Sequence, residues 1–229
     1  MSNTNLILTA HQPNYLPYCG FFHKITLADK FCIFDGVQFE RKGYNNRVLI
    51  KTQQGVQWLT VPVEHGQPRI KDARIVESGW RRKHVRAIEL AYQKAPYFDV
   101  YMPEIRRLIV EPCRYLADFN RFLLYFLLGA LGISKQIVVA SDYRFNGSKS
   151  EAVLDMCRQL GATQYIFGSQ GRDYADVEAF GRAGILLQFQ DYKHPVYPQL
   201  HGDFVAGLSV IDLLFNCGPD SLRILTSGQ

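Results

Sequence analysis

Short apolar runs alternate with amphipathic stretches along most of the chain, and this alternation predicts strands separated by helices. The runs 6–10 and 31–35 are apolar enough for buried strands, and the segment 20–29 between them has helical spacing. A strand, a helix and a strand within about 35 residues form a βαβ unit, which implies a parallel sheet with a right-handed crossover.

The pattern changes in the middle of the chain. Two strand-like runs at 46–52 and 57–63 are joined by Gln53-Gln54-Gly55 and predict a hairpin. Helical spacing then extends over about 80–131 with a break at Pro112. After it the alternation resumes, with strands expected at 137–140, 165–167 and 185–190 and helices at 149–160, 174–182 and 209–217. We predict an α/β fold in one domain, residues 1–229, with a Rossmann-like, mostly parallel sheet, a hairpin and a helical middle insertion.

The composition is that of an ordinary globular protein, with 47% hydrophobic and 21% charged residues. The first five residues are polar, and no basic region precedes an apolar stretch, so we expect no secretory signal. The apolar run 122–131 is about half as long as a bilayer crossing requires, so we expect no membrane span. Five cysteines without a C-x-x-C pair argue against a disulfide framework and favour a cytoplasmic location. Six histidines without an H-x-H or H-x-x-x-H pair predict no metal site.

The net charge of +5 suggests an anionic partner. The lysines and arginines lie in small groups spread along the chain, whereas a nucleic-acid binder usually concentrates its charge on one face. Phosphate on a small molecule explains this distribution as well as a polymer does. We expect no specific binding to DNA.

The loop 11–17 follows the first predicted strand, and ligands of open parallel sheets bind beyond the carboxyl ends of the strands. Two prolines restrict its backbone, so the loop is expected to be rigid. It presents His11, Gln12, Asn14 and Tyr15, a set of polar groups suited to a preorganised site. The alternative is a proline-rich turn with a structural histidine.

Three other loops are candidates by position. The loop after the second strand carries Asp35, Asn46 and Arg47, which suit an anion or a sugar but also fit a solvated connection. Ser148 and Lys149 begin a predicted helix, where an anion site and a simple capping box with Glu151 are both consistent with the sequence.

The third loop, after the strand 165–167, contains Gly168, Ser169 and Gly171, whose backbone N–H groups could cradle a phosphate. Its spacing matches neither a P-loop nor G-x-G-x-x-G.

Two more constellations combine rings with polar or basic groups. Lys83 and His84 lie at the start of a predicted helix, where cations oppose the helix dipole unless an anion compensates. The segment is therefore either a phosphate clamp or an exposed basic face, and the sequence leaves both alternatives open. The segment that carries His194, Tyr197 and Gln199 resembles the loop 11–17 in composition, because a histidine and a tyrosine again lie beside prolines.

Several motifs in order resemble the WbqC-like protein family over nearly the whole chain. They are His11-Gln12-Pro13-Asn14-Tyr15-Leu16-Pro17, Gly20-Phe21-Phe22-His23-Lys24-Ile25, Phe34-Asp35-Gly36-Val37-Gln38-Phe39, Asn45-Asn46-Arg47, Trp58-Leu59-Thr60-Val61-Pro62-Val63, Trp80-Arg81-Arg82-Lys83-His84, Tyr165 to Gly168, His194 to Gln199, and Leu208 to Asn216. The resemblance implies an association with bacterial O-antigen and other surface-polysaccharide gene clusters. It also implies a transferase that attaches glycine or another amino acid to an amino sugar.

The leading hypothesis is therefore a transferase that forms an amide on a nucleotide-linked amino sugar. Such a reaction needs a base for the amine proton and donors for the developing oxyanion. His11 is the candidate base, with His23 and Asp35 as further catalytic candidates. The acyl donor is left open among an adenylate, an aminoacyl-tRNA and a carrier thioester.

Two alternatives stay open. The opening also distantly resembles HxGH nucleotidylyltransferases, although His23 follows Gly20 by three residues rather than one, so ATP is an open cofactor. The other alternative is a non-catalytic module that binds a sugar nucleotide or RNA.

Overall fold

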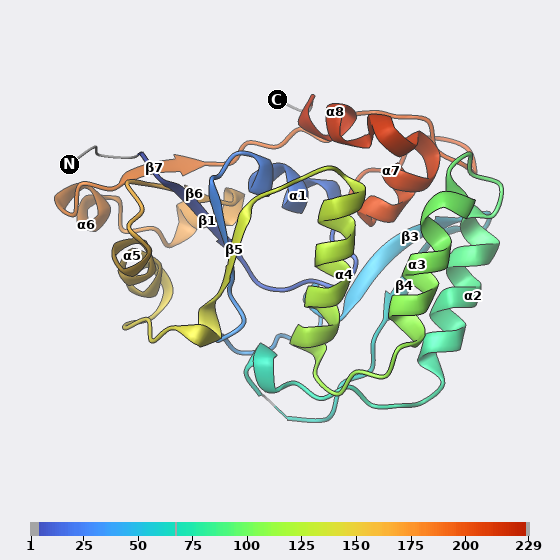
Figure 1. Cartoon of the computed structure of the whole chain (residues 1–229), viewed down its shortest axis with the longest axis horizontal. Coiled ribbons are helices and arrows are strands. Elements are labelled where there is room, and N and C mark those ends of the chain that lie inside the picture. Colours follow the sequence, from blue (N-terminus) through green and yellow to red (C-terminus); the bar gives the residue numbers. More distant parts are fainter. Residues whose placement is uncertain (1–4, 67, 228–229) are drawn as a thin grey trace.

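The computed structural model describes residues 5–66 and 68–227. A five-stranded parallel sheet lies toward one end of the molecule, on the left in Figure 1. Its strands, in spatial order, are β5 (Gln136–Val139), β2 (Lys30–Ile33), β1 (Ile7–His11), β6 (Gln164–Phe167) and β7 (Leu186–Phe189). Numbered by their succession in the chain, the parallel strands read 3-2-1-4-5, which is the order of a doubly wound sheet. The predicted Rossmann-like α/β fold is confirmed.

The sheet is buried on both faces because apolar side chains leave alternate sides of each short strand. In β2, Phe31 and Ile33 join the larger core, whereas Cys32 joins the smaller one on the opposite face. The helices α1 (Cys19–Thr26) and α4 (Leu116–Ala130) contribute to the larger core. The helices α5 (Lys149–Leu160) and α6 (Val177–Arg182) cover the smaller one.

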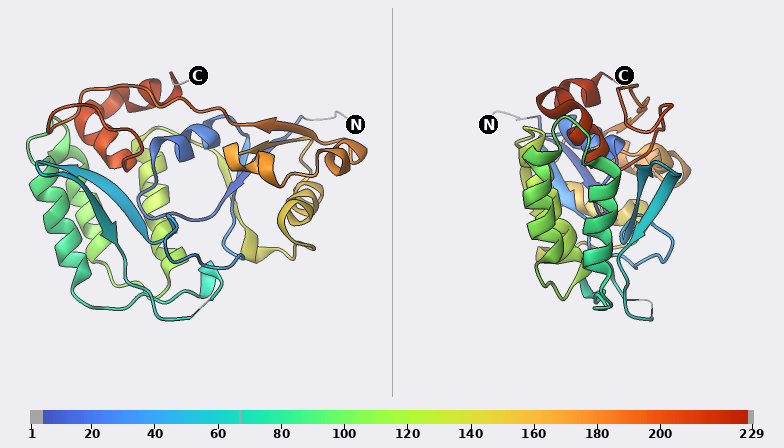
Figure 2. Two further views of the ribbon diagram at one scale, coloured as in Figure 1. Left: turned by 180° about the vertical axis from the view of Figure 1, so that it is seen from behind. Right: turned by 90° about the vertical axis from the view of Figure 1, so that its right-hand side faces the viewer.

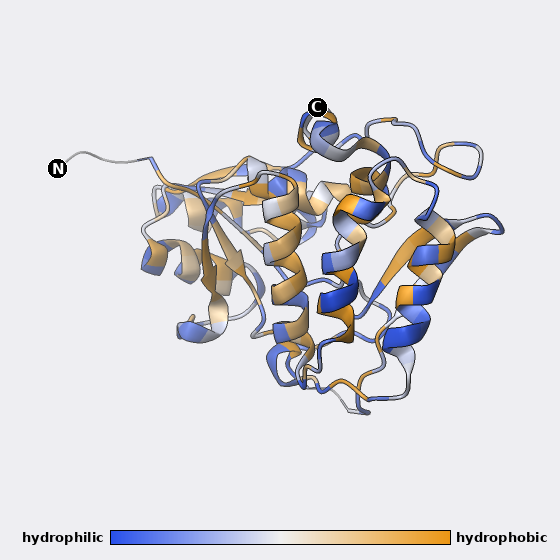
Figure 3. Ribbon diagram, turned by 45° about the vertical axis from the view of Figure 1, so that its right-hand side comes forward, coloured by the Kyte–Doolittle hydropathy of each residue, from blue (hydrophilic) through white to orange (hydrophobic). Residues whose placement is uncertain are grey.

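The middle of the chain extends the larger core away from the sheet. The antiparallel hairpin of β3 (Arg47–Thr52) and β4 (Gly55–Thr60) packs against α2 (Trp80–Tyr92), which lies beside α3 (Phe98–Val110) (Figure 2). Figure 3 shows hydrophilic and hydrophobic residues alternating along α2 and α3, as expected of amphipathic helices that pack on a core. The predicted hairpin and helical middle are thus present.

The remaining elements are short. The helices α7 (Val210–Cys217) and α8 (Ser221–Thr226) end the chain beside α1. Single 3-10 turns lie at η1 (Ile70–Asp72), η2 (Ala140–Asp142), η3 (Ser169–Asp173) and η4 (Gly218–Asp220). Within the part of the chain that the structure describes, no helix is both long enough and apolar enough to cross a bilayer.

Helix termini account for the main differences from the sequence pattern. Ser148 is the N-cap residue of α5, but its side chain makes no capping bond, so the capping box, one of the two alternatives for this segment, does not form. The helix expected from Tyr174 begins instead at Val177, where the carboxylate of Asp176 accepts a hydrogen bond from the N–H of Ala179. Helix propensity and apolar spacing predict that a helix exists, whereas local hydrogen bonds decide at which residue it begins.

Candidate functional site

The strands β1 and β6 are neighbours at the centre of the sheet, and the chain leaves them for opposite sides. This point, where the strand order reverses, is where doubly wound sheets bind ligands beyond the carboxyl ends of their strands. Two predicted loops meet this criterion: the loop 11–17 after β1 and the loop that begins at Gly168 after β6. The fold therefore brings these two candidate segments to one edge.

His11 ends β1 as a neutral imidazole with a defined tautomer. Its Nδ1 lies 2.9 Å from the carbonyl oxygen of Gln12, and a carbonyl can only accept, so Nδ1 donates and Nε2 carries the lone pair. Desolvation and the positive charge of Lys24 lower the pKa of His11 to about 3, against a smaller opposing effect of the Gln12 carbonyl. The ring is therefore neutral, with the lone pair on Nε2 as its proton acceptor, and its low pKa makes it a weak base in the free protein.

Lys24 of α1 is the residue at this edge that sequence reasoning missed. Its side chain is 4% exposed, and its Nζ donates to the carbonyl oxygen of Ala10 at 2.8 Å. A Cβ on Gly168 would lie 3.9 Å from that Nζ, so the amine is situated between the ends of β1 and β6. Among the ion pairs of the described residues none involves Lys24, and burial lowers its pKa to about 7. A buried cation without a carboxylate attracts an anion.

The signal for Lys24 was present in the sequence. Seven of the eight residues of α1 are buried, and Lys24 is among them. A lysine inside an otherwise apolar helix needs a reason, since lysine is almost never fully buried without a partner.

His23, the second catalytic candidate, turns toward the end of β7. Gln190 donates from Nε2 to its Nδ1 at 2.9 Å and to the carbonyl of Gly20. The proton of His23 therefore lies on Nε2, which is buried without a hydrogen-bond partner. The ring packs against Tyr192 at 4.8 Å, and burial lowers the pKa of His23. His23 is thus a donor with an unused hydrogen, not a base.

A buried amide, Asn45, fixes the loop 11–17. Its Nδ2 donates to Oε1 of Gln12, to the carbonyl of Pro13 and to Oδ1 of Asn14, at 3.1 to 3.3 Å. Asn120 of α4 adds donations to the carbonyls of Pro13 and Asn45. The expected rigidity of the loop is therefore supplied by two amides from distant segments as well as by its prolines.

Tyr15 and His84 were expected to contact substrate, but they contact each other in the core. The Tyr15 hydroxyl and Nδ1 of His84 are 2.9 Å apart, and the Tyr15 side chain is fully buried. The rings of Trp80 and Phe119 enclose them. Burial lowers the pKa of His84 to about 4, so it remains neutral. The structure gives this pair a packing role.

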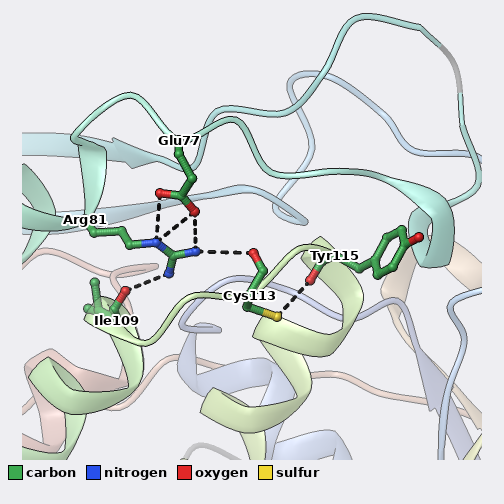
Figure 4. Close-up of polar contacts among 5 residues, drawn as sticks. All are labelled: Glu77, Arg81, Ile109, Cys113 and Tyr115. Carbon is green, nitrogen blue, oxygen red and sulfur yellow. Dashed lines mark hydrogen bonds and ion pairs between the residues drawn. The ribbon is translucent and has the colours of Figure 1, made fainter.

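A phosphate clamp was expected at the start of α2. In the structure a carboxylate of the same chain takes the place of the expected phosphate (Figure 4). The guanidinium of Arg81 pairs with the carboxylate of Glu77 at 2.7 Å and donates to the carbonyls of Ile109 and Cys113. Lys83, which was the predicted contact, is exposed on the outer side of the same helix. The anion that compensates the helix dipole is therefore a glutamate and needs no ligand.

Asp35, the third catalytic candidate, ties the end of β2 to the end of β5. Its two carboxylate oxygens accept from the N–H and the hydroxyl of Ser141, at 3.0 and 2.8 Å. The side chain is buried, and these hydrogen bonds join the end of β5 to the end of β2, which is the neighbour of β1. The bonds support a structural role next to the site.

Asn46 and Arg47 lie at the base of the hairpin. Asn46 donates to the carbonyl of Val61 at 2.8 Å, and Arg47 stacks on Trp58 with its guanidinium carbon 4.2 Å from the ring centroid. They border a cavity of about 250 Å³, which we call the basic hollow. Its lining residues are Phe39, Arg41, Lys42, Asn46, Arg47, Thr60, Val63 and His65.

The remaining loop candidates differ in surroundings. Ser148 and Lys149 are exposed at the start of α5, and Ser169 is exposed after β6. Gly171 is required for packing, because a Cβ there would lie 2.4 Å from the Cβ of Phe167. Of this group, Gly168 is the one shown beside Lys24.

His194, Tyr197 and Gln199 belong to the long irregular segment between β7 and α7. The ring of His194 stacks on that of the buried Tyr197, 6.0 Å away, and its Nδ1 donates to the carbonyl of Pro195. Gln199 accepts at Oε1 from Nζ of Lys51, at 3.3 Å.

Lys51 also donates to the carbonyls of Gly202 and Asp203, so it closes the segment over β3. The hydroxyl of Tyr92 donates to Oδ2 of the buried Asp212 at 3.0 Å, and burial raises the pKa of Asp212. This second polar cluster was missed because its members lie far apart in the chain. No metal-binding group of three or more His, Cys, Asp or Glu side chains occurs among the described residues.

Comparison with known proteins agrees with the motifs. The sequence model of the WbqC-like protein family matches residues 12–224. A protein of Mycobacterium tuberculosis, the uncharacterized protein Rv1507c, is 36% identical over 220 residues, which cover 93% of this chain and 95% of that protein. No solved structure matches the chain. The chain belongs to the WbqC-like protein family.

Proposed function

We propose that the chain is an acyltransferase of bacterial surface-polysaccharide (O-antigen) synthesis. In this proposal it joins an amino acid or another acyl group to the amine of a nucleotide-linked amino sugar, in the cytoplasm. One observation carries the proposal. A neutral His11 and a buried Lys24 without a carboxylate partner lie together where β1 and β6 end. Membership of the WbqC-like family supports an enzyme, and the bacterial context is the one that the resemblance implies.

The reaction needs one proton transfer and one charge to be stabilised. The amine nitrogen of the sugar forms a bond to the acyl carbon, and Nε2 of His11 takes the proton that this nitrogen loses. The bond from the acyl carbon to the leaving group then breaks. The leaving group is the phosphate of an adenylate, the ribose oxygen of an aminoacyl-tRNA or the sulfur of a thioester. Where that group needs a proton, His11 returns it.

Lys24 suits the negative charge that develops on the acyl oxygen or on the leaving group. Its amine is held in place by the Ala10 carbonyl, so its charge is preorganised. An anion beside Lys24 also offsets the charge that lowers the pKa of His11. A substrate anion beside Lys24 therefore offsets the second cause of the low pKa of His11, while desolvation, the larger cause, remains.

The test is product formation with three donors. Purified protein is incubated with nucleotide-linked amino sugars and with an amino acid plus ATP, an aminoacyl-tRNA or an acyl thioester, and the amide is detected by mass spectrometry. His11→Gln should lower turnover at least a hundredfold, while its thermal melting stays near that of the wild type. His201→Asn is the matched control, because the ring of His201 bonds the Ala91 carbonyl on α2. Near-normal turnover in His11→Gln refutes the role of the base.

A second candidate function is favoured by the position of Lys24 beside Gly168. An amine at the carboxyl ends of β1 and β6 also suits the phosphates of ATP, as an activating nucleotidylyltransferase requires. Pyrophosphate release that depends on ATP and on the acid, but not on a sugar, would favour this candidate. Ligand binding without turnover from any donor would instead indicate a binding module.

A further inference from the structure

The outer face of the hairpin exposes a tryptophan beside an arginine. Antiparallel register places Arg47 opposite Thr60 and Leu49 opposite Trp58, so these four side chains share one face. The other face, with Val48, Ile50 and Leu59, is buried against the core. Figure 2 shows helices behind the hairpin and no helix over its outer face.

Aromatic rings continue from the hairpin toward the loop 11–17. The ring of Trp58 lies 6.0 Å from that of Tyr44, and Tyr44 lies 5.7 Å from Tyr18. We call these three residues the aromatic platform. Trp58 is 41% exposed and Tyr44 is 44% exposed, so two large rings face solvent side by side. The two ring planes are inclined by 48°, so a planar ligand can stack on one ring with the other at its edge.

The basic hollow adjoins the platform through Arg47. Arg47 stacks on Trp58 and also lines the hollow, together with Arg41 and Lys42. Among the ion pairs of the described residues none engages these three cations, although Glu40 lines the adjacent part of the surface. Arg41 donates to Nδ1 of His65 at 2.8 Å. Arg47 also donates to the carbonyl of Lys42, and the donors of the hollow that remain suit a phosphate.

Hydrogen bonds connect residues 44–45, at the platform, to the loop 11–17 of the candidate active site. The N–H of Tyr15 donates to the carbonyl of Tyr44, and the next residue, Asn45, bonds the side chain of Gln12. Gln12 in turn follows His11. These contacts join the platform to the end of β1 through residues 44–45 and 12–15.

We propose that the aromatic platform and the basic hollow together bind a nucleoside diphosphate. The base stacks on Trp58 with Tyr44 at its edge, and the diphosphate faces Arg41, Lys42 and Arg47. The charge of the hollow and the planar rings beside it are complementary to this ligand and not to a neutral sugar. The inference rests on the proposed function in one respect, which is that this nucleotide is the carrier of the sugar whose amine reacts at His11.

The experiment measures the binding of UDP, GDP, ADP, CDP and dTDP by calorimetry to the full chain. Trp58→Ala should weaken the best of these ligands about tenfold or more, because stacking on one aromatic ring is lost. Trp58→Phe should retain most of the affinity. Val56→Ala is the matched control, since Val56 is exposed on the same strand without a ring or a charge.

Two partial ligands separate the halves of the site. Binding of pyrophosphate should fall in the double variant Arg41→Ala, Lys42→Ala and stay unchanged in Trp58→Ala. Binding of the nucleoside alone should show the opposite pattern. Equal affinity of wild type and Trp58→Ala for every nucleoside diphosphate overturns the proposal. A preference for an RNA oligonucleotide, with binding that falls steeply with salt, also overturns it in favour of a polymer.

The outcomes for binding and for turnover are independent. Loss of nucleotide binding in Trp58→Ala, together with no acyl transfer by the wild type, supports this site and contradicts the proposed function. Acyl transfer that needs His11 but is indifferent to Trp58 supports the proposed function and contradicts this site.

Discussion

Replacing Lys24 by methionine should stabilise the protein at low pH and abolish the attraction for an anion. Burial lowers the pKa of Lys24 from 10.5 to about 7 in the folded chain. The unfolded chain therefore binds this proton more tightly, and the free energy of unfolding rises with pH between these two values. Below about pH 7 the buried charge costs the full difference, and above about pH 10.5 it costs nothing.

The size of the effect follows from the two pKa values. A difference of about 3.5 pH units corresponds to a destabilisation of about 5 kcal/mol at low pH, as an order of magnitude. Methionine removes this cost but leaves the Ala10 carbonyl without its donor, which costs roughly 1 to 3 kcal/mol. We therefore expect Lys24→Met to be more stable than wild type by roughly 2 to 4 kcal/mol near pH 6.

Urea unfolding from about pH 6 to pH 9 measures this difference. The stability of wild type relative to the variant should rise by about 2 kcal/mol between about pH 7 and pH 9. Lys24→Arg is a useful comparison, because it keeps a charge that does not titrate in this range. Parallel curves for wild type and Lys24→Met would show that Lys24 does not titrate there, and the reasoning would fail.

The remaining predictions address other contacts. Glu77→Gln should lower the free energy of unfolding by about 1 to 2 kcal/mol in urea titrations, because the buried Arg81 loses its carboxylate; unchanged stability would contradict that role. Gly171→Ala should destabilise by roughly 1 to 3 kcal/mol, since its methyl group would overlap Phe167, and unaltered thermal melting would refute the overlap. Burial raises the pKa of Asp212, so the native state loses stability as pH rises above the ordinary aspartate pKa of about 4; Asp212→Asn should remove that decline.

The sequence predicted the fold well because periodicity is a local property. Short apolar runs such as 31–34 suit strands buried on both faces of a sheet, and helices between them fix parallel connections. The loop 11–17 was predictable as a site for the same reason, since it follows a buried strand at the edge where ligands bind. The family resemblance depended on motifs and was confirmed by comparison.

Partners at long range were not predictable from local pattern. Histidine is a residue type typical of functional sites, but Nδ1 of His84 is hydrogen-bonded in the core to the hydroxyl of Tyr15, 69 positions away in the chain. The cations at the start of α2 suggested a ligand until Glu77 was placed beside Arg81. A side chain's role depends on what its polar atoms meet, and the sequence alone does not give that.

The sequence by itself determined which segments are strands and helices and which loop follows β1. Tertiary structure alone decided that Lys24 lies beside Gly168 and that Asn45 holds Gln12. The physical reason is that apolar burial is non-directional and is encoded in the spacing along one segment. Hydrogen bonds and charge contacts are directional and short, so they exist only where the fold brings distant atoms to within bonding distance.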